Sequence, residues 1–498
     1  MQNVAKTRSG IHAQLLLVAV ALALLVGRAA AAPPAHEGPF LDARKTMLCG
    51  DVDTCRAIST DYYRERGFDG NPNSPRGTLE MWKSTNAFGK PLADGDDEAT
   101  AVYYNRGDLD IGRNMNCRSR IVKQPPAEPF TFVTLACYVA NYGDGISGHD
   151  FFGNSDPGKS IENAKNAVTP IATVVMETTY IKELAFTEPE VWFAVFDKAG
   201  KPITEATLDN SQNNQQANQQ AVPGICLSCH GGHGGYTGSG FPTPISSNGG
   251  RVVVQEAHFL PFDTALYRYG DGTRQTPNAA ESESFRKLNA MIRAAYAPYA
   301  PQSHVIPDLI DGLYAWCGGV GKAGCAIDPV GHPFVPSADC KPDIPNARRT
   351  CGWTTGRPNF PFRKPGFDIA AFYNGVVAPY CRSCHVGAPQ RFNVQNFQSW
   401  IGRSQNGQPG TAVLVDSVVR QRGLMPFAQT TFNAYFADAN AIKLMSQFLD
   451  PVQVGTSQRP QCLDRCAKTK AACDAEPNPN RPQCRAEWRQ CVAACPPI

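Results

Sequence analysis

The chain has 498 residues, of which 42% are hydrophobic and 18% charged; this describes a globular protein of several domains and excludes a single small domain or a disordered chain. The 47 basic and 44 acidic residues nearly cancel, so charge gives no reason to expect nucleic acid as a partner. The 18 cysteines suit an oxidising compartment, where free thiols do not persist.

The N-terminus has the pattern of a secretory signal peptide. Lys6 and Arg8 precede an apolar run over 15–26, and small residues suited to cleavage follow at 29–32. The run is too short to span a bilayer, which needs about 20 apolar residues. We therefore expect residues 1–32 to be removed during export. The mature chain is predicted to be periplasmic or otherwise exported, and not to be an integral membrane protein.

Residues 33–220 predict a β-rich domain, mainly β or α+β. Alternating or β-branched runs occur at 131–140, 171–179 and 191–196. The segment 103–108, Tyr-Tyr-Asn-Arg-Gly-Asp, mixes aromatic and charged residues and could contact the edge or a propionate of a haem. An exposed loop is the more ordinary interpretation of such a segment.

Two C-x-x-C-H motifs carry the chemistry of the sequence; their cysteines and histidines are Cys226, Cys229, His230, Cys381, Cys384 and His385. Two thiols at this spacing can each form a thioether with a porphyrin vinyl group, and the adjoining imidazole then binds the iron as its proximal ligand. A zinc site or a redox dithiol would not require the histidine that ends both motifs. We predict two covalently bound haem c groups, which leaves an even number of cysteines for disulfides.

The second motif lies in a segment, 366–451, that resembles the class I cytochrome c family in the order of its elements. Asp368 can cap a helix that leads into the motif, with Pro379 expected to kink its end. Gly-Leu-Met-Pro follows at 423–426, and a further helix is expected over 438–449. The resemblance implies an α-helical cytochrome c domain in which the terminal helix packs on the first helix.

The same resemblance implies the ligands of the second haem iron. His385 would be the proximal ligand, and Met425, in the Met-Pro pair, would be the distal one. An iron with these two ligands is closed to substrates and suits electron transfer.

The first motif, within 221–310, fits no such template. An Asn/Gln-rich stretch precedes it, and no Met-Pro pair follows it nearby. Met176 and His258 are possible distal ligands, with Met291 a weaker one, although a methionine in a strand or helix is ordinarily a core residue. An iron without a distal ligand is the remaining alternative.

The other cysteines predict disulfides. The connection 311–365 contains four, and four more lie before the first motif; their pairing is left open. They are Cys49, Cys55, Cys117, Cys137, Cys317, Cys325, Cys340 and Cys351. The tail 456–498 predicts a helical hairpin stapled by three nested bridges, which are Cys473 to Cys484, Cys466 to Cys491 and Cys462 to Cys495.

These expectations combine into a multidomain α+β protein that carries two haems and exchanges electrons with a redox protein as donor or acceptor. The main alternative is a haem-dependent oxidoreductase that resembles dihaem peroxidases, with an open first haem. The long β-rich domain departs from that family, so the resemblance implies no catalytic residues. The sequence does not indicate an oligomeric state.

Overall fold

The computed structural model describes most of the chain between residues 40 and 449. The described ranges are 40–47, 49–123, 131–146, 155–179, 190–207, 219–231, 245–247, 250–252, 257–297, 305–327, 367–387, 415, 418–419, 422–426, 428–449, 469, 472–473, 483, 487 and 490–491. All of them belong to a compact unit spanning His36–Ile498, and a second unit spans Met1–Ala35. The predicted signal peptide, Cys340, Cys351 and four of the six tail cysteines lie outside the described residues.

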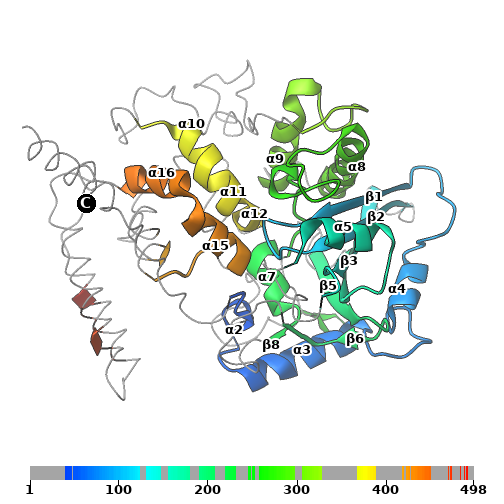
Figure 1. The fold of residues 1–498 in the computed structure, drawn as a ribbon. Helices are drawn as coiled ribbons and strands as arrows, with labels where there is room; N and C mark the ends of the chain where they lie inside the picture. Colours follow the sequence, from blue (N-terminus) through cyan, green and yellow to red (C-terminus); the bar gives the residue numbers. More distant parts are fainter. Residues whose placement is uncertain are drawn as a thin grey trace, which may run out of the picture. The chain divides into compact units, whose positions relative to one another are not determined.

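A six-stranded antiparallel sheet forms the N-terminal part (Figure 1). Each strand pairs with the next one in the chain, so the sheet is a meander. The strands are β1 (Asp97–Tyr104), β2 (Gly112–Lys123), β3 (Thr131–Tyr142), β4 (Ala172–Thr179), β5 (Glu190–Asp197) and β6 (Pro202–Ile203). The three runs expected to be strands lie in β3, β4 and β5. Together with the helices, the sheet confirms the predicted α+β class.

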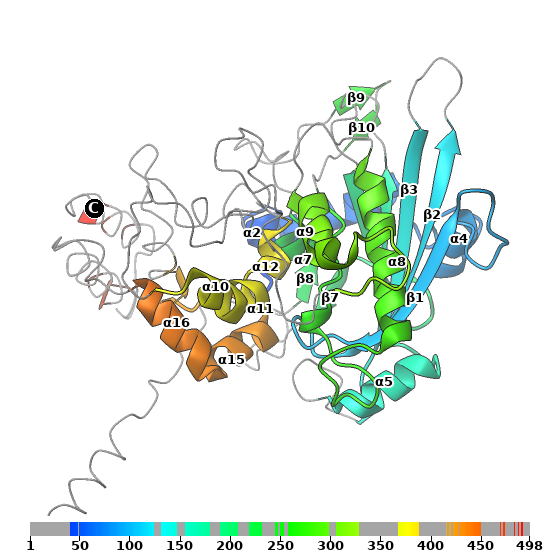
Figure 2. The ribbon, with the colours of Figure 1, turned by 90° about the horizontal axis from the view of Figure 1, so that it is seen from above.

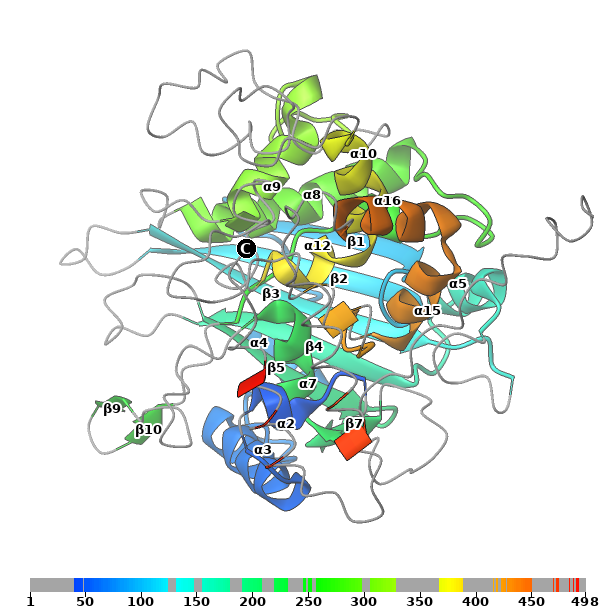
Figure 3. The same ribbon diagram turned by 90° about the vertical axis from the view of Figure 1, so that its left-hand side faces the viewer.

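Helices cover both faces of this sheet (Figure 3). The helices α3 (Val52–Arg66) and α4 (Leu79–Thr85) contribute to one hydrophobic core with β4 and β5. On the other face, α8 (Ala279–Tyr296) lies over β1 and β3, and α9 (Val305–Tyr314) packs on α8 (Figure 2). The apolar alternation along each strand supplies both cores, because successive side chains point to opposite faces.

Two tyrosines of α3 hold β5 in place. The Tyr62 hydroxyl accepts a hydrogen bond from the Phe193 amide and donates one to the Phe193 carbonyl, each 2.9 Å long. The Tyr63 hydroxyl accepts from the Val195 amide at 2.9 Å. Phe193 and Val195 are buried, so these hydroxyls supply partners for main-chain groups that would otherwise be buried without them.

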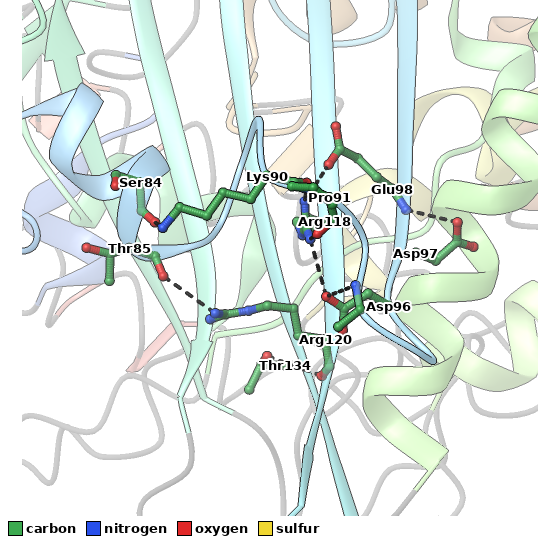
Figure 4. Close-up of polar contacts among 11 residues, drawn as sticks. Ser84, Thr85, Lys90, Pro91, Asp96, Asp97, Glu98, Arg118, Arg120 and Thr134 are labelled. Atoms are coloured by element: carbon green, nitrogen blue, oxygen red, sulfur yellow. Dashed lines mark hydrogen bonds and ion pairs between the residues drawn. The ribbon is translucent and has the colours of Figure 1, made fainter.

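A buried arginine attaches the loop before β1 to the sheet (Figure 4). Arg118 in β2 donates to the carbonyl oxygens of Lys90 at 2.7 Å and Pro91 at 2.9 Å. Its guanidinium also forms ion pairs with Asp96 at 3.3 Å and Glu98 at 3.1 Å. The paired carboxylates and carbonyls compensate the cost of burying the charge.

The C-terminal helices adjoin the helix that leads into the second motif. This leading helix consists of α10 (Ile369–Phe372), a π-helix η5 (Tyr373–Val377) and α11 (Ala378–Tyr380). The motif follows in α12 (Arg382–His385), and α15 (Gln429–Ala437) and α16 (Ala439–Leu449) complete the group. The π-helix, which has a wider turn than an α-helix, ends just before Pro379. The helix irregularity that we expected at this proline is therefore found about one turn earlier.

The expected terminal helix is observed as α16, and it packs on the leading helix. The rings of Phe372 and Phe448 stack with centroids 4.7 Å apart. A Cβ atom at Gly375 would lie 2.5 Å from a methyl carbon of Leu444, so a larger residue there would require the Leu444 side chain to shift.

The remaining elements are short connections and two-stranded pairs. They are α2 (Ala43–Thr46), α5 (Pro157–Lys165), β7 (Glu205–Thr207), β8 (Gln219–Ala221), α7 (Gly224–His230), β9 (Ile245–Ser247), β10 (Gly250–Val252), η2 (Thr264–Leu266) and η4 (Ala315–Cys317).

The segment 257–263, which we call the strap, is anchored to α8 by one buried side chain. Asn289 accepts a hydrogen bond from the Phe262 amide at 2.8 Å and donates to the Phe262 carbonyl at 3.0 Å. Its amide also donates to the Tyr314 hydroxyl at 3.0 Å, which links the strap to α9 as well.

Replacing Asn289 by leucine should destabilise the protein, because the main-chain groups of Phe262 stay buried without partners. We expect Asn289→Leu to lower the free energy of unfolding by about 2–4 kcal/mol in equilibrium denaturation. The control is Leu92→Ala, at a side chain that is 52% exposed, which should change it by less than about 0.5 kcal/mol. Equal effects of the two variants would contradict this role.

Candidate haem-attachment site

The first motif lies on the short helix α7, which places Cys226 and Cys229 three positions apart on one helical face. Burial raises the pKa of the Cys226 thiol to about 12. A thioether carries no ionisable group, so conversion of this thiol into a thioether suits the desolvated surroundings.

The hydrogen bond of His230 leaves one ring nitrogen available for a metal. Its Nδ1 lies 2.7 Å from the carbonyl oxygen of His258, and since that oxygen can only accept, Nδ1 carries the proton. Desolvation lowers the pKa of His230 to about 4, so the ring is neutral at pH 7. Its Nε2 therefore presents a lone pair, which is the arrangement that metal-binding histidines adopt.

Two further contacts fix the position of this imidazole. The amide of His258 donates to the carbonyl oxygen of His230 at 3.0 Å, so the strap and the motif form a reciprocal pair of hydrogen bonds. The ring of Phe193 in β5 meets the imidazole edge-on, with centroids 4.9 Å apart. The sheet, the strap and α7 together orient His230.

The second motif is placed on α12 at the end of the leading helix. Burial raises the pKa of the Cys381 thiol to about 12, as for Cys226 in the first motif. His385 is buried, and Cys384 is partly accessible.

The two motifs, which lie in separate segments of the sequence, are in direct contact. The Sγ atoms of Cys229 and Cys384 are 3.1 Å apart. A Cβ atom at Gly231 would lie 2.0 Å from the carbonyl oxygen of Gly387, and one at Gly387 would lie 2.6 Å from that of Cys229. The contact therefore requires glycine on both sides, and Gly231 also has a φ of +78°, a conformation that favours glycine.

A buried ion pair links the second motif to the strap. Arg382 pairs with Asp263, and their side chains are only 4% and 8% exposed. Arg382 also donates to the Tyr373 hydroxyl at 2.8 Å. The strap thus bonds to the first motif at His258 and to the second at Asp263.

Removing one partner of this pair should be costly, because a charge is then left buried alone. We expect Arg382→Met to lower the free energy of unfolding by about 3–5 kcal/mol. The double variant with Asp263→Asn should recover part of this loss, and a double-mutant cycle by chemical denaturation measures the coupling. Additive losses would show that the two side chains do not act as a pair.

The pairing of the other cysteines sets the motif cysteines apart. Disulfides join Cys49 to Cys55, Cys117 to Cys137 and Cys317 to Cys325, which settles three pairings that the sequence left open. Cys473 and Cys491 are also disulfide-bonded, and the partners predicted for them lie outside the described residues. Among the described cysteines, only the four of the two motifs are free.

The proposed distal ligands occupy different surroundings. Met176 in β4 is buried and pairs across the sheet with Cys137 and Phe193. The carbonyl oxygen of His258 bonds to Nδ1 of His230 and not to the free Nε2. The ring of His258 stacks on the ring of Tyr296, with centroids 6.2 Å apart. Met291 is a core residue of α8.

Met425 lies just before α15 and is partly accessible. The two residues before it are held by main-chain hydrogen bonds, from Gly423 to Val419 at 3.3 Å and from Leu424 to Val418 at 3.0 Å. The Met-Pro segment thus directly precedes α15 and α16, which pack on the helix that leads into the second motif.

The segment 103–108 is only in part the exposed loop that the sequence favoured: Tyr103 and Tyr104 end strand β1, and Arg106 lies exposed in the turn that follows. Tyr103 and Tyr104 are buried, because α8, α5 and the C-terminal helices pack around the turn between β1 and β2. The hydroxyls of Thr430 and Thr431, at the start of α15, donate to the carbonyl oxygens of Asp108 and Gly107. The turn therefore adjoins the Met-Pro segment.

Sequence reasoning did not single out Arg113, which the fold brings close to the first motif. Arg113 pairs across the sheet with Tyr103, and its charge contributes to the low pKa of His230, after desolvation. Asp108 forms an ion pair with it at 3.4 Å. One arginine among many in a β-rich segment gives no sequence signal for this position.

No family model, curated protein or solved structure matches this chain. Within the described ranges, no group of three or more His, Cys, Asp or Glu side chains is arranged to hold a metal ion. No helix in that part of the chain has the length and hydropathy needed to cross a membrane.

Proposed function

We propose that this protein is an exported dihaem c-type cytochrome that transfers electrons to and from a redox protein. The observation that carries the proposal is the state of its cysteines: every described cysteine is disulfide-bonded except the four in the C-x-x-C-H motifs. In an oxidising compartment, thiols that stay out of disulfides are expected to be engaged in another covalent bond.

The geometry of His230 supports the same proposal. A neutral imidazole with Nδ1 bonded to a carbonyl has Nε2 ready for iron. A haem supplies a one-electron redox centre whose potential depends on its axial ligands and its burial. We propose His230 and His385 as the proximal ligands and Met425 as the distal ligand of the second iron.

The contact between the motifs supports electron exchange within the chain. Haems attached at Cys229 and Cys384 would be bonded to sulfur atoms that touch each other. The protein then supplies no intervening layer between the two attachment points, and an electron that enters at one haem reaches the other directly.

A haem-dependent oxidoreductase with an open first iron is the second candidate function. Two observations on the possible distal ligands favour it. The main chain of His258 bonds to Nδ1 of His230. Met176 packs within the sheet. A haem without a distal ligand would leave a coordination position for a small substrate.

The number of attached haems tests the proposal. The full chain, produced in a bacterial host that matures c-type cytochromes, should carry two covalent haems by intact mass and Soret absorbance. The double variants C226A/C229A and C381A/C384A should each retain one. As a control, C317A/C325A, which removes a disulfide outside the motifs, should retain two. A wild-type chain without haem would overturn the proposal.

Electron paramagnetic resonance distinguishes the two candidate functions and tests the contact. Two low-spin signals in the oxidised protein are expected for a carrier, and one high-spin iron is expected for the enzyme.

The two irons should also interact magnetically, which broadens the spectrum relative to the sum of the two single-haem variants. A wild-type spectrum equal to that sum would show that the haems are not neighbours.

A further inference from the structure

The structure contains a buried cation whose hydrogen-bonding capacity is incompletely used. The side chain of Arg113 in β2 is only 14% exposed. Its Nε atom is buried and has no hydrogen-bond partner among the described residues. A buried donor without a partner costs about 1–3 kcal/mol, and such a group needs an explanation, of which a bound ion or water is one.

The carboxylate that pairs with Arg113 in the described part of the chain is a weak partner. Asp108 reaches the guanidinium at 3.4 Å, longer than the 2.7–2.9 Å of strong charge-assisted bonds. Desolvation raises the pKa of Asp108, and the charge of Arg113 opposes that rise. The Nε donor of Arg113 is therefore the group left for a second acceptor.

Two phenol rings border the same position. Tyr103, the cross-strand partner of Arg113, has its ring centroid 4.3 Å from that of Tyr267. Burial raises the pKa of both phenols, so they remain neutral and each can donate a hydrogen bond. The Tyr103 hydroxyl also accepts a hydrogen bond from the Arg113 guanidinium. One guanidinium flanked by two neutral phenols is a set of donors that fits an anion and disfavours a cation.

The cluster lies close to the first haem-attachment motif. The charge of Arg113 is among the causes that lower the pKa of His230, and the charge of Asp108 acts on Cys226. An anion held by Arg113 would therefore lie near the porphyrin that the motif is proposed to carry.

We propose that Arg113, with Tyr103 and Tyr267, forms a binding site for a carboxylate or small oxyanion beside the first haem. This inference rests on the proposed function and deepens it. Two kinds of anion could occupy this site: a propionate of the haem itself, or a diffusible anion that reaches the first iron. In the first case the site anchors the haem and sets its potential, and in the second it selects an anionic substrate.

The test compares Arg113→Gln with Arg120→Gln in the mature full-length protein. Arg120 is a matched control because it lies on the same strand and points to the opposite face, and its guanidinium donates to the Thr85 carbonyl at 3.5 Å (Figure 4). Each protein is assayed for haem content, for its two midpoint potentials and for the Soret response to sodium formate.

If a propionate occupies the site, Arg113→Gln lowers one midpoint potential, because a positive charge near the haem is lost, and formate changes neither protein. If a diffusible anion occupies it, the wild type shows a saturable formate response, and Arg113→Gln weakens the formate affinity about tenfold or more. Arg113→Lys keeps the positive charge but removes the Nε donor. This variant is used in place of Arg113→Gln if the glutamine variant does not yield folded protein.

Equal potentials and equal formate responses in the Arg113 and Arg120 variants, with two haems in the wild type, would overturn the anion site alone. A wild-type chain without haem would overturn both this inference and the proposed function. The haem assay thus separates the two failures.

Discussion

The structure around the site depends on one close approach of two main chains. Gly231 and Gly387 meet so closely that neither position has room for a Cβ atom. Each glycine lies within two residues of the histidine that ends its motif, so their contact brings the two cysteine pairs together. The reciprocal hydrogen bonds between His230 and His258 and the buried ion pair of Arg382 with Asp263 then hold this contact from both sides.

The strap explains how the two halves of the chain share one site. Its main chain bonds to the first motif, its Asp263 bonds to the second, and Asn289 fixes the neighbouring Phe262 to α8. The sheet supports the same assembly from the opposite direction, because the hydroxyl of Tyr62 positions Phe193 and the ring of Phe193 contacts His230. The β-rich region is thereby part of the proposed haem environment.

The turn between β1 and β2 extends this environment. It carries Asp108, leads into Arg113 and is bonded at Gly107 and Asp108 by the first residues of α15. One polar turn is therefore bonded to the start of α15 and carries a charge that acts on Cys226 of the first motif. A charged cluster at such a junction can influence both proposed haems, since electrostatic interactions are strong where water is excluded.

Several features followed from the sequence alone because their causes are local. The two C-x-x-C-H motifs need only helical spacing, the strands β3 to β5 follow from β-branched runs, and the cap of α10 follows from Asp368, whose side chain accepts from Ala371. Only the tertiary structure decided the contact of Cys229 with Cys384, the disulfide pairing, the strap and the position of Arg113. Cys229 and Cys384 lie 155 positions apart, and Cys117 and Cys137 lie on neighbouring strands. A sequence pattern records which side chains are present, but not which partner each one meets or which main chains have room to approach.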